Sequence, residues 1–500
     1  MSRMPRLCPS LRRPAPVRGM ILPMLALFVC SACAPPAARQ ARGLMAQGDP
    51  VGAEAAADQG LARDPGHEEL WRLKIEAALA GGDAARAIGL YETWQQGRGT
   101  HDRALLGRLA RLTLAQGLRV PSAQVRAAAV QAIERQEIIS LARAVAGRID
   151  DEDDLGAAAA SVALLRSQPG AARVAAQLLR SEDPAARALV ITGTARKLGA
   201  ATRDSVRAAL GDGDLRVRRA AVRALAPMAT DQDLQRLAVM AGADPEARVR
   251  TAALQALGRL PGRQSVPIAV IEPALAAARQ ALARPDQAPL GERLAAVALL
   301  ARQGDAAALQ GLAATADPVL AVAAAAALRD RTPSLLAEAI ARGLTDPTPA
   351  VRQAVLEAVR TLPATDAAHL AGVHASDQSW GVRLAAARVL LYLGEIGDAA
   401  LRRQATPIFA AALTEAPEKL RVQAAIDLAR MGEPRGIAAL TELSASADAS
   451  VRQSVVGAYE LVRARQPRVA GALVLVLARA LADGSPLVRI RAAEILVASR

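Results

Sequence analysis

Residues 244–257, which read DPEARVRTAALQAL, are the stretch that decides the fold. Asp followed by Pro is typical of a helix start, because the Asp side chain caps free backbone N–H groups and Pro fits the first helical turn. Val249, Ala253 and Leu257 then recur at helical spacing and form one apolar stripe. The stretch therefore predicts an amphipathic helix that packs closely on a neighbour through small side chains.

The same pattern recurs from residue 121 to residue 500. With the position of Val249 as the anchor, the copies fall at residues 125, 155, 186, 217, 249, 290, 320, 351, 382, 420, 451 and 488. Eight of the eleven intervals span 30 to 32 residues, which suits one helix pair per copy. A single pair cannot bury its apolar faces alone, so we expect the pairs to stack into a curved rod. Positions two and six after the anchor, such as Gln353, Glu357, Ile490 and Glu494, are expected to face solvent.

An earlier segment, from about residue 36 to residue 117, repeats with a different period. Gly48-Asp49 recurs 34 positions later as Gly82-Asp83, and Ala53 recurs as Ala87. A small residue lets two helices approach closely, and Gly-Asp suits the turn between them. This segment therefore also predicts helix pairs.

Both repeats resemble known families. The Asp-Pro loop followed by Val-Arg and the Ala-Leu stripe resembles HEAT repeats, in the short form found in phycobilisome-lyase-like proteins. The 34-residue pattern, with Trp71, Ala87 and Tyr91 at its aromatic and small positions, resembles tetratricopeptide repeats. These resemblances imply an all-α chain with the α-α superhelix (solenoid) fold, tetratricopeptide-like over residues 41–118 and HEAT-like over residues 119–500. They also imply that the partners are proteins or peptides.

Aromatic residues are scarce, with three Trp, three Tyr and two Phe in 500 residues. The densest group is Trp71, Tyr91 and Trp94, in the tetratricopeptide-like segment. Two interpretations stay open for it. The rings either pack inside a helix pair, or they contact a bound peptide.

The N-terminal residues carry a targeting pattern. An Arg-bearing stretch without acids precedes the apolar run of residues 20–29, which is far shorter than the roughly 20 residues that span a bilayer but suits a signal peptide. Cys30-Ser31-Ala32-Cys33 follows and resembles the bacterial lipobox. An ordinary secretory peptide and an uncleaved anchor are the alternatives.

The lipobox resemblance implies that residues 1–32 are removed and that Cys33 becomes the lipidated first residue. Residues 33–40 would then form a tether. Ala34, rather than Asp, after the Cys resembles the signal for the outer membrane. We therefore expect a membrane-anchored lipoprotein of the cell envelope that faces the periplasm.

The charge does not point to nucleic acid. The five arginines of the leader reduce the net charge from +14 to +9 when they are removed. The densest positive cluster is Arg216, Arg218, Arg219 and Arg223, but the solvent-side positions along the whole array are mixed in sign and nearly free of aromatics. That composition forms neither a phosphate track nor a stacking platform, so no nucleic-acid partner is predicted.

No catalytic or metal site is predicted. Asp and Arg recur six residues apart in five copies, as at Asp244 and Arg250, which indicates a structural ladder between loops of the same or neighbouring repeats. The acidic run of residues 150–154 lacks EF-hand spacing, and the processed chain would keep only the lipidated Cys33. His369 and His374 are five residues apart, not the four of a zinc-binding helix, and so few histidines place no catalytic triad. We expect no cofactor and no small-molecule substrate. The prediction is thus a lipid-anchored envelope scaffold. The first alternative is an enzyme or enzyme-associated factor related to HEAT-like lyases or hydroxylases, and the second is a nucleic-acid binder.

Overall fold

A computed structural model describes residues 35–96, 98, 101–260 and 267–498, and every regular element in these ranges is a helix. The predicted all-α fold is therefore confirmed. Cys33 and the predicted leader lie outside the described residues. In the part of the chain that is described, no helix is both long and apolar enough to cross a membrane.

Two compact units make up the chain, residues 1–100 and residues 101–500. The sequence-based division falls instead at residues 118/119. The difference concerns helix α6 (Arg103–Gly117), whose buried leucines belong to the second unit. Each unit is described by itself below.

In its described residues the first unit consists of two helix pairs, α2 (Pro36–Ala46) with α3 (Pro50–Leu61) and α4 (Glu68–Ala80) with α5 (Ala84–Gln95). Gly48 and Gly82 have φ of 79° and 85°, a left-handed conformation that favours glycine. The Asp after each glycine caps the next helix, since Asp49 accepts a hydrogen bond from the backbone N–H of Gly52 at 2.9 Å and Asp83 one from that of Arg86 at 2.9 Å. The Gly-Asp repeat thus makes the turns that the sequence predicts.

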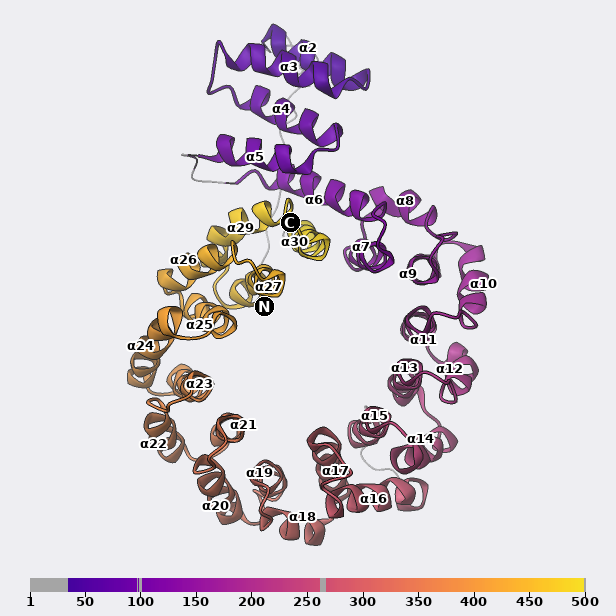
Figure 1. Cartoon of the computed structure of the whole chain (residues 1–500), viewed down its shortest axis with the longest axis vertical. Coiled ribbons are helices and arrows are strands. Elements are labelled where there is room, and N and C mark those ends of the chain that lie inside the picture. Colours follow the sequence, from indigo (N-terminus) through magenta and orange to yellow (C-terminus); the bar gives the residue numbers. More distant parts are fainter. Residues whose placement is uncertain (1–34, 97, 99–100, 261–266, 499–500) are drawn as a thin grey trace, which may run out of the picture. The chain divides into compact units, whose positions relative to one another are not determined.

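The second unit has an inner and an outer row of helices (Figure 1). The inner row carries the recurring motif. It comprises α7 (Ala123–Arg135), α9 (Asp154–Leu164), α11 (Pro184–Leu198), α13 (Leu215–Leu225), α15 (Ala247–Gly258), α17 (Leu290–Gln303), α19 (Pro318–Ala327), α21 (Pro349–Val359), α23 (Trp380–Ile396), α25 (Glu418–Met431), α27 (Ala449–Arg465) and α30 (Pro486–Ala498).

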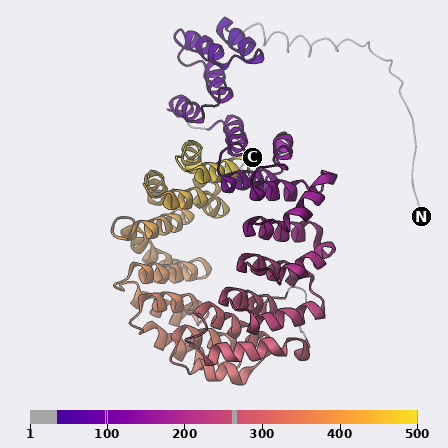
Figure 2. The same cartoon turned by 45° about the vertical axis from the view of Figure 1, so that its right-hand side comes forward.

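The outer row lies behind it, and successive helix pairs stack on one another (Figure 2). It comprises α8 (Ala142–Ala146), α10 (Pro169–Leu178), α12 (Arg203–Ala209), α14 (Asp231–Ala243), α16 (Ile268–Ala283), α18 (Ala306–Ala313), α20 (Pro333–Leu344), α22 (Ala364–His374), α24 (Ala399–Glu415), α26 (Pro434–Leu443), α28 (Pro467–Ala470) and α29 (Val474–Ala480).

Small side chains let the two rows pack closely. Inner helices bury the motif's apolar stripe, so that Val249, Ala253 and Leu257 of α15 are each at most 1% exposed. Gly343 of α20 lies so near α21 that a Cβ atom added to it would come within 2.6 Å of Val355. The alanine-rich composition thus serves close helix packing rather than any site.

The second unit closes on itself, because α30 packs against α6 and α7 (Figure 1). A Cβ atom added to Gly117 would lie 3.1 Å from the Cδ1 atom of Ile490. Across the same contact, which we call the seam, the Arg135 Nε atom donates a hydrogen bond to the Glu494 carboxylate at 2.6 Å. The helix pairs stack into a curved array as predicted, but the array closes, so this unit is a ring rather than an open rod.

Two predicted solvent-side residues are buried for this reason. Ile490 is 5% exposed and Glu494 is 4% exposed. Their positions in the motif are those that face the centre of the ring in other repeats, such as the exposed Gln353 and Glu357. In α30 the helices from the beginning of the unit cover that side.

Candidate protein-binding face

Arginines next to the anchor connect the loops of successive repeats. The Nε and Nη2 atoms of Arg218 donate to the Asp244 carboxylate of the following loop at 2.8 and 3.0 Å. Its Nη1 atom donates to the backbone oxygen of Asp212, in its own loop, at 2.9 Å. Equivalent contacts recur at Arg187, Arg352 and Arg452. The predicted structural ladder is confirmed, and each Arg binds its own loop and the next one together.

Pairing with arginine favours the ionised form of the ladder residue Asp377. Hydrogen bonds from Arg352 and from the backbone N–H of Ser379 lower the pKa of Asp377. The bond to Asp377 raises the pKa of Arg352 in turn. Such paired carboxylates are poor proton donors or acceptors near neutral pH. The recurring Asp and Arg residues therefore hold the scaffold together.

One repeat departs from the predicted register. Arg250 binds Glu292 of α17 through two hydrogen bonds of 2.7 and 2.9 Å, where other repeats use a loop Asp. Arg293, next to it, donates to Asp317 at 2.8 Å. The anchor of this repeat is thus residue 292, and the predicted anchor at Leu290 is wrong by two residues. The sequence pattern did not predict this register, because Glu292 occupies the anchor position that is apolar in other repeats.

The predicted acidic run also belongs to the ladder. Asp151 accepts hydrogen bonds from Arg126 at 2.8 and 2.9 Å, and its side chain is 1% exposed. Asp153 pairs with the same Arg126. Throughout the residues that the structure describes, no three His, Cys, Asp or Glu side chains are grouped as metal ligands would be. His67 caps helix α4 by accepting from the Leu70 N–H at 3.4 Å.

The inner row leaves one side of each helix uncovered, and we call these sides together the inner face. On α21 it carries the exposed residues Gln353 and Glu357, on α27 Gln453, and on α11 Thr192. The exposed side chains along it therefore differ from repeat to repeat. A surface of this kind has no reactive group at its centre, and it suits recognition by area.

The aromatic group of the first unit is mostly core. Tyr91 is fully buried and Trp94 is 6% exposed, and their rings meet edge to face with centroids 6.0 Å apart. Trp71 is half-buried, its Nε1 atom donates to the Pro65 oxygen at 2.8 Å, and Lys74 lies 5.4 Å from the ring centre. Tyr91 and Trp94 thus offer no surface to a peptide in this conformation. Of the three aromatic residues, Trp71 is the one whose ring is accessible for a peptide contact.

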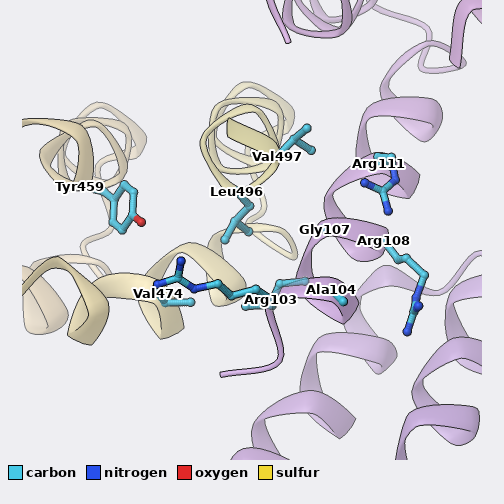
Figure 3. Close-up of a pocket in the computed structure, with 10 residues that line it drawn as sticks. Arg103, Ala104, Gly107, Arg108, Arg111, Tyr459, Val474, Leu496 and Val497 are labelled. Atoms are coloured by element: carbon cyan, nitrogen blue, oxygen red, sulfur yellow. The ribbon is translucent and has the colours of Figure 1, made fainter. Parts of the chain in front are cut away.

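A pocket of about 410 Å³ lies at the seam, between α6 and the helices α27, α29 and α30 (Figure 3). Leu106, Val474 and Leu496 supply apolar surface, and the Arg103 side chain extends from α6 toward Val474. No sequence signal could have predicted it, because its walls come from opposite ends of the unit. Its size and apolar lining suit an apolar side chain.

Comparison with known proteins identifies the repeat. Residues 171–258 match the family of HEAT repeats, which confirms that prediction for this segment. No curated protein matches the chain in sequence.

Solved structures give distant likenesses. The chain is similar to the myosin chaperone UNC-45 from C. elegans in complex with a Hsp90 peptide, with 12% identity, a TM-score of 0.34, and coverage of 92% of this chain and 71% of that one. It is also similar to a chain in a structure of Kap95p with RanGDP, with 14% identity, a TM-score of 0.32 and coverage of 79% of this chain. It spans 55% of that chain's length.

Proposed function

We propose that this HEAT-repeat chain is a scaffold that binds a protein partner on the inner face of its ring and catalyses no reaction. The observation that carries the proposal is the division of labour among the polar side chains. Arg and Asp residues of the loops are bound to one another, while the exposed inner-face residues Gln353 and Gln453 belong to no such pair in the described residues and the inner-face residues differ from repeat to repeat. An extended surface of this kind suits one large ligand.

We further propose that the chain is a lipoprotein of the cell envelope, anchored through Cys33 in the outer membrane and facing the periplasm. The lipobox resemblance of residues 30–33 supports this localisation. The tetratricopeptide-like helix pairs of the first unit would add a second surface for proteins. Trp71 is the residue of that unit from which a peptide contact is proposed.

Site-specific photocrosslinking tests the scaffold. A photoreactive residue is placed at Thr192, Gln353 or Gln453 on the inner face, and at Gln177 or Glu338 on exposed positions of outer helices. The full chain is expressed in its own host and irradiated. We expect the inner positions to crosslink one common protein and the outer positions to crosslink none.

The proposal is judged by comparing crosslinking from the inner-row positions with crosslinking from the outer-row positions. Crosslinks to a partner from Gln177 and Glu338 alone would contradict the inner-face proposal. No crosslink from any position, with the helix content intact by circular dichroism, would contradict the scaffold itself. Gln177 is the matched control for Gln353 and Gln453, because all three are exposed glutamines on helices.

A further inference from the structure

Three arginines gather on neighbouring inner helices. Arg219 and Arg223 lie on the side of α13 opposite its buried stripe of Val217, Ala221 and Leu225. Arg248 lies on the matching side of α15, which packs against α13. We call these three the inner arginine cluster. It is part of the inner face.

The cluster lacks counter-charges. Within the described ranges, none of its three arginines forms an ion pair or a hydrogen bond with another side chain, and the buried Nε atom of Arg219 has no hydrogen-bond partner. Arginines around them are satisfied: Arg216 pairs with Asp214 at 3.0 Å and Arg218 with Asp244 at 2.8 Å. Among the arginines that the structure describes in α13 and α15, the lack of acidic partners is therefore confined to the inner arginine cluster.

This arrangement is unfavourable without a ligand. Burial and the charges of Arg223 and Arg248 lower the pKa of Arg219. Like charges held close together repel, and a buried guanidinium N–H without an acceptor loses hydrogen-bond energy. An anion placed between the three side chains would remove both costs and accept charge-assisted hydrogen bonds.

The surroundings favour carboxylates over a nucleic-acid strand. The residues that follow Arg248 on the same side of α15 are the uncharged Thr251 and Gln255, and neither α13 nor α15 carries an aromatic residue on which a base could stack. Further round the inner face, Glu357 is exposed and negative. A phosphate backbone needs a continuous positive track, whereas a few acidic side chains need only this cluster.

We propose that Arg219, Arg223 and Arg248 form a binding site for carboxylate side chains, occupied by an acidic segment of a protein partner. This inference rests on the scaffold function proposed above and names the chemistry of the segment. Guanidinium groups bind carboxylates through paired hydrogen bonds, so the site would fix the register of the partner on the ring.

The test measures binding of a fluorescein-labelled oligoglutamate peptide to the full chain by fluorescence anisotropy. The variant R219Q/R223Q/R248Q should bind it at least about tenfold more weakly, because it loses three charged contacts. The control R216Q removes an exposed arginine of α13 that is already paired with Asp214, and it should bind as the wild type does. Oligoglutamine should not bind to either chain.

Several outcomes would overturn the proposal. One is equal affinity of wild type and the triple variant for oligoglutamate, and another is an equal loss in R216Q. Displacement of the peptide by an oligothymidylate of the same charge at lower concentration would assign the cluster to nucleic acid instead. If the triple variant unfolds, R248Q alone replaces it, since this exposed side chain has no structural partner in the described residues.

Photocrosslinking separates this inference from the scaffold function. If inner-face crosslinks from Gln353 persist in the triple variant at wild-type yield, the scaffold stands and the acidic-segment proposal fails. If oligoglutamate binding depends on the cluster but no inner position crosslinks a protein, the anion site stands and the scaffold fails, and with it the assignment of the site to a protein partner.

Discussion

Removal of one ladder arginine tests how the repeats are held together. In Arg352→Ala the chain loses two hydrogen bonds to Asp377, of 2.8 and 2.9 Å, and two to the backbone oxygens of Asp346 and Pro347, of 2.7 and 3.1 Å. The side chains of Arg352 and Asp377 are 14% and 8% exposed, so the remaining carboxylate stays mostly buried without its partner. Breaking such a pair costs about 3 kcal/mol.

The assay is urea denaturation of the full chain combined with hydrogen exchange across α21 to α23. The variant should lose about 3 kcal/mol of unfolding free energy, with faster exchange centred on the loop that holds Asp377. Arg403→Ala is the matched control, since this exposed arginine of α24 should change the free energy by less than about 0.5 kcal/mol. Equal losses in the two variants would refute the ladder account.

The same variant has a pH signature. Because the pKa of Asp377 is lowered in the folded chain, the pair stabilises the fold above the unfolded pKa of about 4, and this stabilisation is lost as the pH falls through the folded pKa. The difference between wild type and Arg352→Ala should therefore be full at pH 7 and shrink below about pH 4. A difference in unfolding free energy that is independent of pH would show that lost packing, not the lost ion pair, destabilises the variant.

Four further changes have defined outcomes. Burial opposes ionisation of Asp233, but hydrogen bonds from Arg207 and Thr230 lower its pKa to about 2, so Asp233→Asn should cost about 2 kcal/mol at pH 7 and far less near pH 2 in denaturation experiments. Tyr91→Ala removes a fully buried ring and should cost about 3–5 kcal/mol by thermal unfolding of the first unit. Trp71→Ala should lower the free energy of unfolding by less than Tyr91→Ala does, yet reduce the yield of crosslinking between the first unit and a bound peptide. An unchanged crosslinking yield would count against the proposed contact. Cys33→Ala should abolish labelling by a palmitate analogue and release the chain from membranes; retained label would place the lipid elsewhere.

Local sequence was sufficient for the helices and the ladder. Asp caps, the Val-Arg anchor and the alanine stripe act within one repeat, so their spacing predicted the inner helices and the role of Arg218 and Asp244. The 34-residue period likewise predicted the Gly48 and Gly82 turns. These features depend on contacts between residues close in the chain, or in adjacent repeats.

Ring closure depends on something that no single repeat encodes. A small rotation between successive pairs accumulates over the unit, and only its sum brings α30 to α6 and α7. Ile490 and Glu494 occupy motif positions that face the ring centre elsewhere, so the pattern could not mark them as buried. The anchor of the repeat at Glu292 was likewise mispredicted from the sequence. The acidic side chain of Glu292 interrupts the apolar stripe, because it takes the place of a loop Asp as the partner of Arg250.

The closed seam is the claim on which the inner face depends, and a distance measurement tests it most directly. Spin labels are attached at Gln124→Cys on α7 and Leu487→Cys on α30, both exposed positions, in a chain whose three native cysteines are replaced by serine. Double electron–electron resonance should give one short, narrow distance distribution. Addition of Ile490→Asp, which buries a carboxylate against Gly117, should broaden it and shift it to longer distances. A long, broad distribution in the chain with Ile490 intact would contradict the ring.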